Sequence, residues 1–119
     1  MSAVIGVVDD DPSVLRALTR LLGVSGFTVR TFGSAEAFLA HDHSGIDCLL
    51  LDVHLGGLSG FDLQERLVEA RVSIPIVFIT AFDDPATRER ALKGGVAYVG
   101  KPFDEHLLLD AIESALGRG

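Results

Sequence analysis

The feature that most constrains the fold is an apolar run without polar alternation, Cys48-Leu49-Leu50-Leu51, which ends at Asp52. Successive side chains of a strand point to opposite faces, so a strand of this composition is buried on both of them. Parallel sheets are covered by helices on both faces, whereas antiparallel sheets commonly expose one face to water. The run therefore predicts a strand of a parallel sheet, with Asp52 at its carboxyl end.

Short apolar segments alternate with helical patterns along the rest of the chain. Strands are expected over residues 4–8, 27–32, 46–51, 76–79 and 96–99, and helices over 12–22, 34–39, 60–70, 85–94 and 104–116. The expected N-cap residues are Asp11, Ser34, Ser59, either Asp83 or Asp84, and Asp104. Gly23 and Gly26 are expected to end the first helix. Strands joined by helices run parallel, which predicts an α/β fold: a doubly wound five-stranded parallel sheet of flavodoxin-like order 2-1-3-4-5, with helices on both faces.

The composition fits one domain. The 119 residues are 48% hydrophobic and 23% charged, without a linker, repeat or low-complexity stretch, so residues 1–119 are expected to form a single domain. The net charge of −7 argues against nucleic-acid binding, which needs clustered Lys and Arg. No polybasic run, signal peptide or apolar stretch of transmembrane length is seen, so no membrane association is expected. A lone cysteine, Cys48, cannot form an internal disulfide, and the chain is interpreted as cytoplasmic.

Polar residues end four of the predicted strands. Asp9 and Asp10 follow the first strand, while Asp52, Thr80 and Lys101 follow the third, fourth and fifth. Ligands of open parallel sheets bind in the crevice at the carboxyl ends of the strands. Three carboxylates, a hydroxyl and an ammonium group are therefore expected to converge on one spot.

This combination of groups favours phosphoryl chemistry beside a metal ion. Neighbouring carboxylates repel one another, and a hard divalent cation such as Mg²⁺ relieves that repulsion. Lys101 and Thr80 suit a phosphoryl group next to the metal, and one carboxylate can be the nucleophile that receives it. Helix capping is the simpler explanation for an acid at a strand end. It is preferred for Asp11, which precedes Pro12, but it does not fit Asp52, which is followed by glycines rather than a helix.

Together these segments resemble the receiver domains of two-component response regulators, over essentially the whole chain. The motifs that carry the resemblance are Val7-Val8-Asp9-Asp10-Asp11, Leu50-Leu51-Asp52, Gly60 eight residues after Asp52, Ile79-Thr80-Ala81, Gly94-Gly95 and Lys101-Pro102-Phe103. The family implies a signalling switch that takes a phosphoryl group from a histidine kinase or phosphotransfer protein and controls an output domain or protein. It implies no enzymatic activity beyond Mg²⁺-dependent self-phosphorylation and slow autodephosphorylation. Phosphorylation-dependent homodimerisation is left open. Residues 31–39 are also similar to the N-terminal receiver domains of LuxR-type DNA-binding regulators.

The resemblance implies a role for each residue of the phosphorylation site. Asp52 is the expected phosphoacceptor, and Lys101 is expected to pair with a phosphoryl oxygen. Asp10 resembles the direct ligand of Mg²⁺ (or Mn²⁺), and Asp9 the acid that binds mainly through metal-bound water. The backbone carbonyl of His54 is expected to complete the metal ligands together with Asp52.

The resemblance also implies a route from the site to the surface. Thr80 resembles the switch hydroxyl that moves toward the phosphoryl group, and Tyr98 the aromatic residue that changes rotamer when Thr80 moves. This would repack the face formed by the fourth helix, fifth strand and fifth helix. A cis peptide is expected at Lys101-Pro102, where it would aim the lysine into the site.

One segment departs from the family pattern. Receivers often have proline four residues after the phosphoacceptor, and this chain has Gly56-Gly57 there. Glycine makes a loop looser and costs more backbone entropy to order. His54 and Phe82, two positions past Asp52 and Thr80, are expected to flank the site.

Other functions remain as alternatives. Asp9-Asp10-Asp11 also matches the Asp-x-Asp motif of haloacid dehalogenase-like phosphatases, but such an enzyme would leave Asp52 and Lys101 without a role. A flavodoxin-like nucleotide or flavin carrier needs a phosphate-cradling loop after the first strand, and this acidic loop would repel a phosphate unless a metal were bound. His41 and His43 could belong to a transition-metal site, but the preferred interpretation is that they lie in a solvated loop. Cys48 is expected to be inert core.

Overall fold

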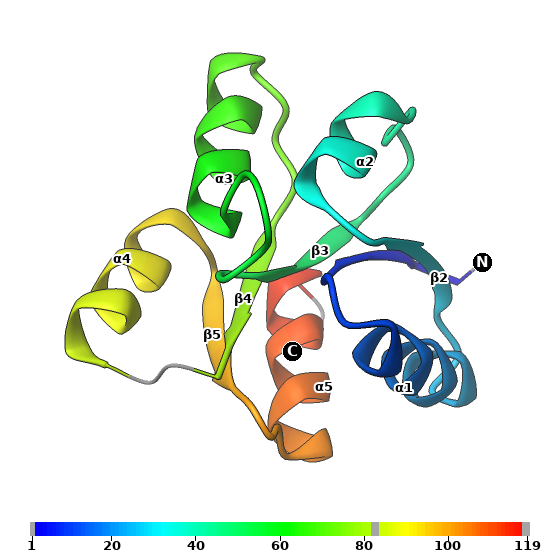
Figure 1. The fold of residues 1–119 in the computed structure, drawn as a ribbon. Coiled ribbons are helices and arrows are strands. Elements are labelled where there is room, and N and C mark those ends of the chain that lie inside the picture. Colours follow the sequence, from blue (N-terminus) through cyan, green and yellow to red (C-terminus); the bar gives the residue numbers. More distant parts are fainter. Residues whose placement is uncertain (1, 82–83, 118–119) are drawn as a thin grey trace.

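Five strands and five helices alternate along the part of the chain that the computed structural model describes, residues 2–81 and 84–117 (Figure 1). The strands are β1 (Val4–Val8), β2 (Thr28–Phe32), β3 (Cys48–Asp52), β4 (Ile76–Thr80) and β5 (Ala97–Gly100). The helices are α1 (Pro12–Val24), α2 (Ala35–Ala40), α3 (Gly60–Glu69), α4 (Pro85–Gly94) and α5 (Glu105–Ala115). Neighbouring strands all pair in parallel, in the order β2-β1-β3-β4-β5. The predicted α/β fold and strand order are confirmed.

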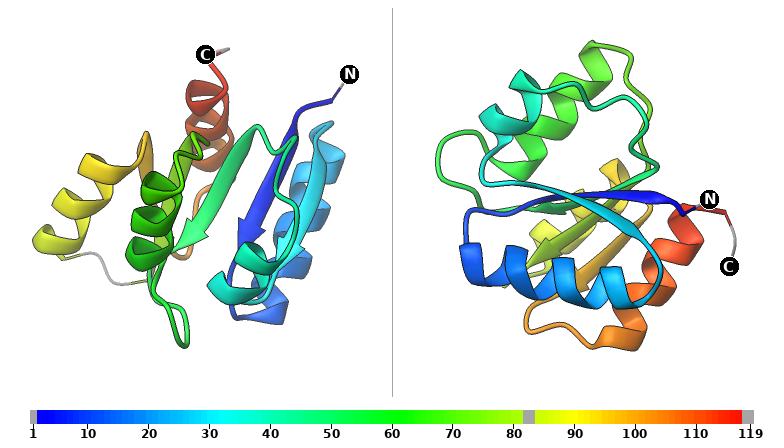
Figure 2. Two further views of the ribbon diagram at one scale, coloured as in Figure 1. Left: turned by 90° about the horizontal axis from the view of Figure 1, so that it is seen from above. Right: turned by 90° about the vertical axis from the view of Figure 1, so that its right-hand side faces the viewer.

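The sheet separates two apolar cores. Helices α1 and α5 cover one face, and α2, α3 and α4 cover the other (Figure 2). Strand β3 is buried throughout and serves both cores: Leu49 and Leu51 pack in the α2–α3–α4 layer, whereas Cys48 and Leu50 pack in the α1–α5 layer. The apolar run that predicted a parallel sheet is therefore explained by alternation between two covered faces.

Side-chain caps begin the helices where the sequence places them. The N-cap residues whose side chains accept a backbone N–H in the first turn are Asp11, Ser34, Ser59, Asp84 and Asp104. Asp84 is thus the cap of α4, and the alternative, Asp83, lies outside the described residues. These caps fix the path by which each strand end turns into the next helix.

Several predicted boundaries are wrong by one or two residues. Helix α1 continues through Gly23 to Val24, because the turn that ends it is made later: the Ser25 hydroxyl donates to the Leu21 carbonyl (2.9 Å) and Gly26 takes up a φ of +95°. Strand β3 begins at Cys48, because the N–H of Ile46 is directed to the His43 carbonyl in a preceding turn (3.4 Å). Strand β2 begins one residue later than predicted, and β5 is shifted one residue along the chain. None of these shifts moves a strand's carboxyl end away from the site.

No helix among the described residues is both long and apolar enough to cross a bilayer.

Candidate functional site

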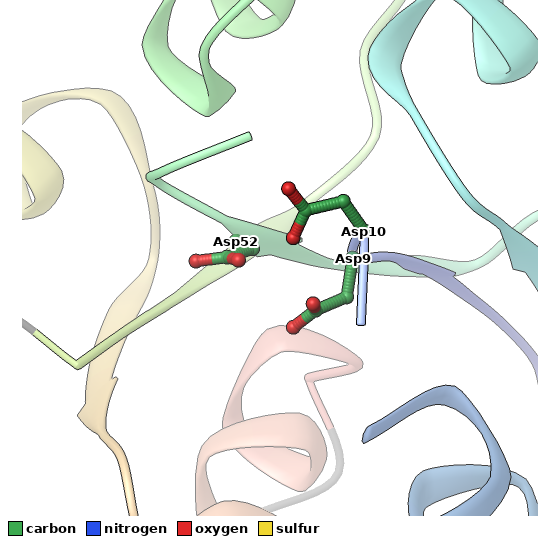
Figure 3. Close-up of side chains that lie close together, drawn as sticks. All are labelled: Asp9, Asp10 and Asp52. Atoms are coloured by element: carbon green, nitrogen blue, oxygen red, sulfur yellow. The ribbon is translucent and has the colours of Figure 1, made fainter. Parts of the chain in front are cut away.

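Three carboxylates meet at the carboxyl end of the sheet. Asp9 and Asp10 follow β1, and Asp52 is the last residue of β3, the neighbouring strand. One oxygen from each of the three lies within 4.8 Å of the others (Figure 3). Asp9 is fully buried and Asp52 is 4% exposed, whereas Asp10 is exposed to solvent. The parallel register thus brings Asp52 next to two acids that lie 42 and 43 positions earlier in the chain, as the sequence predicts.

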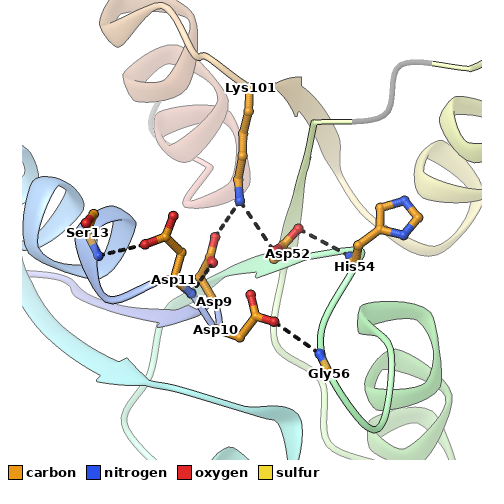
Figure 4. A network of polar contacts seen from close by, with 8 residues as sticks. All are labelled: Asp9, Asp10, Asp11, Ser13, Asp52, His54, Gly56 and Lys101. Atoms are coloured by element: carbon orange, nitrogen blue, oxygen red, sulfur yellow. Dashed lines mark hydrogen bonds and ion pairs between the residues drawn. The ribbon is translucent and has the colours of Figure 1, made fainter.

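Lys101 places its ammonium group between two of these acids. It follows β5, and its Nζ lies 2.7 Å from Asp9 Oδ2 and 3.3 Å from Asp52 Oδ2 (Figure 4). The Lys101-Pro102 peptide is cis, which confirms the prediction for this bond. Lys101 thus contacts the two buried acids, whereas Asp10 is the acid of the cluster that is exposed to solvent.

Burial and charge act together on the site's electrostatics. Burial is the main cause that raises the pKa of Asp52, the charge of Asp9 raises it further, and Lys101 opposes both. Burial would lower the pKa of Lys101, but the hydrogen bonds and charges of Asp9 and Asp52 outweigh it and raise that pKa. One lysine stands against three carboxyl groups, so the cluster has more acidic than basic groups and favours a cation.

The donor set fits Mg²⁺ or Mn²⁺. Carboxylate oxygens are the ligands that these hard cations prefer, and Asp9, Asp10 and Asp52 supply them within one small cluster. The partly exposed position of the cluster, with Asp10 open to solvent, also leaves room for the waters that Mg²⁺ retains. An acidic cluster that could bind a metal is therefore present where the sequence predicts it.

The loop after β3 is tied to the site through its backbone. The N–H of His54 donates to Asp52 Oδ1 (3.3 Å), and the N–H of Gly56 donates to Asp10 Oδ2 (3.2 Å) (Figure 4). At the far end of the loop, a Cβ on Gly60 would collide with the backbone carbonyl of Asp52, so only glycine fits where α3 begins. The loop that carries the His54 carbonyl therefore runs beside both Asp52 and Asp10.

Thr80 and Tyr98 lie on the two strands next to β3. Thr80 is the last residue of β4 and is fully buried, and its carbonyl accepts the Lys101 N–H (2.7 Å). Tyr98 on β5 is half-buried, pairs in register with Phe78 and packs against the α2–α3–α4 core. Phe82, the other expected flanking residue, lies outside the described residues.

The remaining histidines and the cysteine lie away from the acids. The His43 ring stacks on Phe38 (4.9 Å between centroids), and His41 Nδ1 lies 2.6 Å from the Ala37 carbonyl oxygen. Among the described residues, neither belongs to a cluster that could hold a metal. Cys48 is buried, and that burial raises the pKa of its thiol to about 12. These placements agree with the interpretation of the histidines as loop residues and of Cys48 as core.

One contact near the site is not visible in the sequence. Glu36, in the first turn of α2, accepts the backbone N–H of Leu58 through its Oε2 (3.2 Å). The two residues are 22 positions apart, and their contact depends on how α2 packs beside the β3–α3 loop. A local sequence pattern carries no signal for such a contact.

Comparison with known proteins identifies the family. The family model "Response regulator receiver domain" matches residues 5–113. The chain belongs to this family. This receiver is 44% identical over 118 residues to Nodulation protein W of Bradyrhizobium diazoefficiens and 42% identical over 117 residues to response regulator protein TodT of Pseudomonas putida. Those matches cover 98% and 97% of this chain but only 52% of each relative, so the receiver spans about half the length of these relatives.

Solved structures are similar to this receiver over nearly its whole length. The structure of response regulator StyR has a TM-score of 0.88 and 47% identity, and it covers 98% of this chain and 60% of its own. FixJ-N has a TM-score of 0.90 and 31% identity, covering 100% and 97%. Receiver domains of two-component response regulators are phosphorylation-dependent signalling switches that act with histidine kinases and output domains. This assignment replaces the phosphatase and flavodoxin-like alternatives.

Proposed function

We propose that this receiver accepts a phosphoryl group from a histidine kinase or phosphotransfer protein on Asp52. The observation that carries the assignment is the difference between the two buried acids. Asp9 is fully buried and both of its oxygens are engaged at short distance, by the Asp11 N–H (2.9 Å) and by Lys101 Nζ (2.7 Å). The two hydrogen bonds of Asp52 to residues in the described ranges are longer, at 3.3 Å each. The carboxylate oxygens of Asp52 are therefore held by longer hydrogen bonds than those of Asp9. This favours Asp52 as the nucleophile, because an attacking oxygen must give up its hydrogen bonds.

The chemistry is an exchange of one bond to phosphorus for another. An Asp52 oxygen forms the new P–O bond while the P–N bond of the donor phosphohistidine breaks, and the bonding pair stays on the histidine nitrogen. Lys101 binds a phosphoryl oxygen, and the Thr80 hydroxyl donates to another. Asp9, Asp10, Asp52 and the carbonyl of His54 would hold Mg²⁺ or Mn²⁺, which would supply positive charge to the phosphoryl oxygens. The same groups support slow hydrolysis, so the domain acts as a switch with no other catalytic turnover.

The proposed output is a repacked surface. Thr80 moves toward the phosphoryl group, Tyr98 takes the space that it leaves, and the face formed by α4, β5 and α5 changes its packing. The weak attachment of α4 supports this proposal, because Ala91 is the only residue of that helix that is fully buried. A partner that prefers the repacked face stabilises it by its difference in affinity for the two states.

The proposal extends to the cellular setting of the domain. Residues 1–119 form one receiver domain that works in the cytoplasm, and its acidic surface does not itself bind nucleic acid. Relatives named transcriptional regulatory proteins, such as FixJ of Rhizobium meliloti, point to a transcription-regulating output domain as the downstream partner.

Phosphorylation of single variants tests the assignment of Asp52. With acetyl phosphate and Mg²⁺, intact-mass or Phos-tag analysis should show one phosphoryl group on the wild type and none on Asp52→Asn. Asp42→Asn is the matched control, because Asp42 precedes β3 at the opposite end of the sheet. It should label like the wild type. Labelling of Asp52→Asn at the wild-type rate would show that another residue is the acceptor.

A further inference from the structure

The Gly56-Gly57 segment needs an external support. Gly57 has a φ of +81°, in the region that glycine adopts readily, and Gly56 and Gly57 are both exposed. A pair of glycines lacks the restriction that proline gives to the backbone. The loop also carries the His54 carbonyl and contacts Asp10, so disorder in it would spread into the metal-binding groups.

Two carboxylates accept hydrogen bonds from the backbone of this segment. Asp10 accepts the N–H of Gly56 (3.2 Å), and Glu36 accepts the N–H of Leu58 (3.2 Å). The Glu36 carboxylate also lies against Gly57, since a Cβ on that glycine would be only 2.7 Å from Glu36 Oε2. The three consecutive residues 56–58 are therefore clamped between the end of β1 and the first turn of α2.

The two carboxylates differ in what else they do. Asp10 belongs to the acidic cluster, whereas Glu36 is not a member of any cluster of possible metal ligands among the described residues. Neutralising Asp10 with a cation weakens its attraction for the Gly56 N–H, but leaves Glu36 unaffected. The Glu36 side chain is exposed, but the helical turn that carries it is anchored because Ala35 and Phe38 are fully buried.

We infer that Glu36 is a positioning residue for the metal site, which supports the glycine loop in the place where family members often have proline. The inference rests on the metal site proposed above. Glu36 touches neither metal nor phosphoryl group; it acts through the backbone of residues 56–58 on Asp10 and on the His54 carbonyl. Leu55 and Leu58 pack against the core, so the loop stays folded without Glu36 while its backbone loses the anchor.

Mg²⁺ affinity of the unphosphorylated protein, measured by calorimetry or NMR titration, tests this role. Glu36→Ala should weaken binding about tenfold, the low end for residues that support metal ligands. Glu36→Gln should bind nearly as the wild type, because its amide oxygen can still accept the Leu58 N–H. The matched control is Glu105→Ala, which removes the acid from the first turn of α5. It should leave the affinity unchanged.

Hydrogen exchange of the metal-free wild type gives a second measurement that needs no variant. The Leu58 amide should be protected, and Glu36→Ala should remove that protection while Gly60, bonded to the Val53 carbonyl, keeps its own. Wild-type affinity in Glu36→Ala, equal loss in Glu36→Gln, or an unprotected Leu58 amide in the wild type would each overturn the inference. Asp10→Asn separates the two proposals: if it also binds Mg²⁺ like the wild type, the metal site itself is wrong.

Discussion

At the scale of single residues, the site is a balance of charge around one lysine. Lys101 neutralises part of the charge on Asp9 and Asp52. Its Nζ lies closer to Asp9, the acid that is fully buried, than to Asp52. Asp52 is left with a raised pKa and with partners at 3.3 Å. The acceptor is therefore destabilised in its ionised form before any cation or phosphoryl group is bound.

Removal of this charge should stabilise the metal-free protein. We expect Asp52→Asn to have a higher free energy of unfolding than the wild type at pH 7.5 in EDTA, because burial and the charge of Asp9 disfavour the ionised carboxyl group. A raised folded-state pKa means that the wild type loses stability as pH rises from the unfolded pKa through the folded one. The advantage of the variant should therefore shrink as pH falls toward 4.

Urea denaturation in EDTA across pH 4.5–7.5 measures this difference directly. Asp42→Asn provides the comparison, because Asp42 is an exposed loop residue whose pKa is lowered by a hydrogen bond from the Ser44 backbone. That variant should not gain stability. A metal-free Asp52→Asn that is less stable than the wild type at pH 7.5 would contradict the charge balance described here.

At the scale of elements, α4 stands apart from the other helices that cover the sheet. It contributes one fully buried side chain, Ala91, to the core. One attachment of α4 to α3 is Arg90, whose guanidinium lies 4.5 Å from the centre of the Phe61 ring and 3.1 Å from Glu65 Oε1. Phe61 in turn packs on Phe78 of β4. Helix α4 is thus fastened largely through a surface contact.

Arg90→Ala should loosen α4 selectively. The ion pair and the cation–π contact are both partly exposed and are together worth about 1 kcal/mol. Hydrogen exchange should become faster in α4 and stay unchanged in α1 and α5. Lys93→Ala is the control in the same helix, since Lys93 pairs with Glu89 one turn earlier in α4 (3.3 Å). Uniform acceleration over all helices would instead indicate that Arg90 stabilises the whole fold.

Elements were predictable wherever their signals are local. The apolar strands and the N-cap residues lie in short stretches of sequence, and the sheet order follows from repeated β-α units. The C-terminal end of α1 and the start of β3 were misplaced because hydrogen bonds of Ser25 and Ile46 in the adjoining turns decide them. The acids and Lys101 could be placed together because parallel strands share one carboxyl edge. Glu36 could not, because its contact depends on the packing of α2.

At the scale of the whole molecule, the site and the proposed output face are connected through adjacent strands. Asp52 pairs in register with Ile79, Thr80 follows on β4, and Phe78 pairs with Tyr98 on β5. A change at the carboxyl end of β3 therefore has a short structural path to α4, β5 and α5. The path crosses the α2–α3–α4 layer, to which Tyr98 belongs.

Beryllofluoride, a mimic of the acyl phosphate, should reveal this path. In the wild type, NMR shifts or hydrogen exchange should change beside Asp52 and also along α4, β5 and α5. In Thr80→Ala, the changes beside Asp52 should persist while those around Tyr98 are largely lost, because the hydroxyl that couples the two is missing. Changes that remain confined to the site in the wild type would show that this chain has the fold without the switch.

The division of the interior by the sheet has a consequence for protein engineering. The α1–α5 layer, built on residues such as Leu18, Leu22 and Ile112, shares no buried side chain with the layer that holds Phe61 and Phe78. Substitutions that touch different neighbours combine additively. Substitutions around Leu18 and Leu22 of α1 can therefore be used to raise thermal stability with little effect on the packing of the α2–α3–α4 layer, whereas α5 belongs to the proposed output face and should be left unchanged.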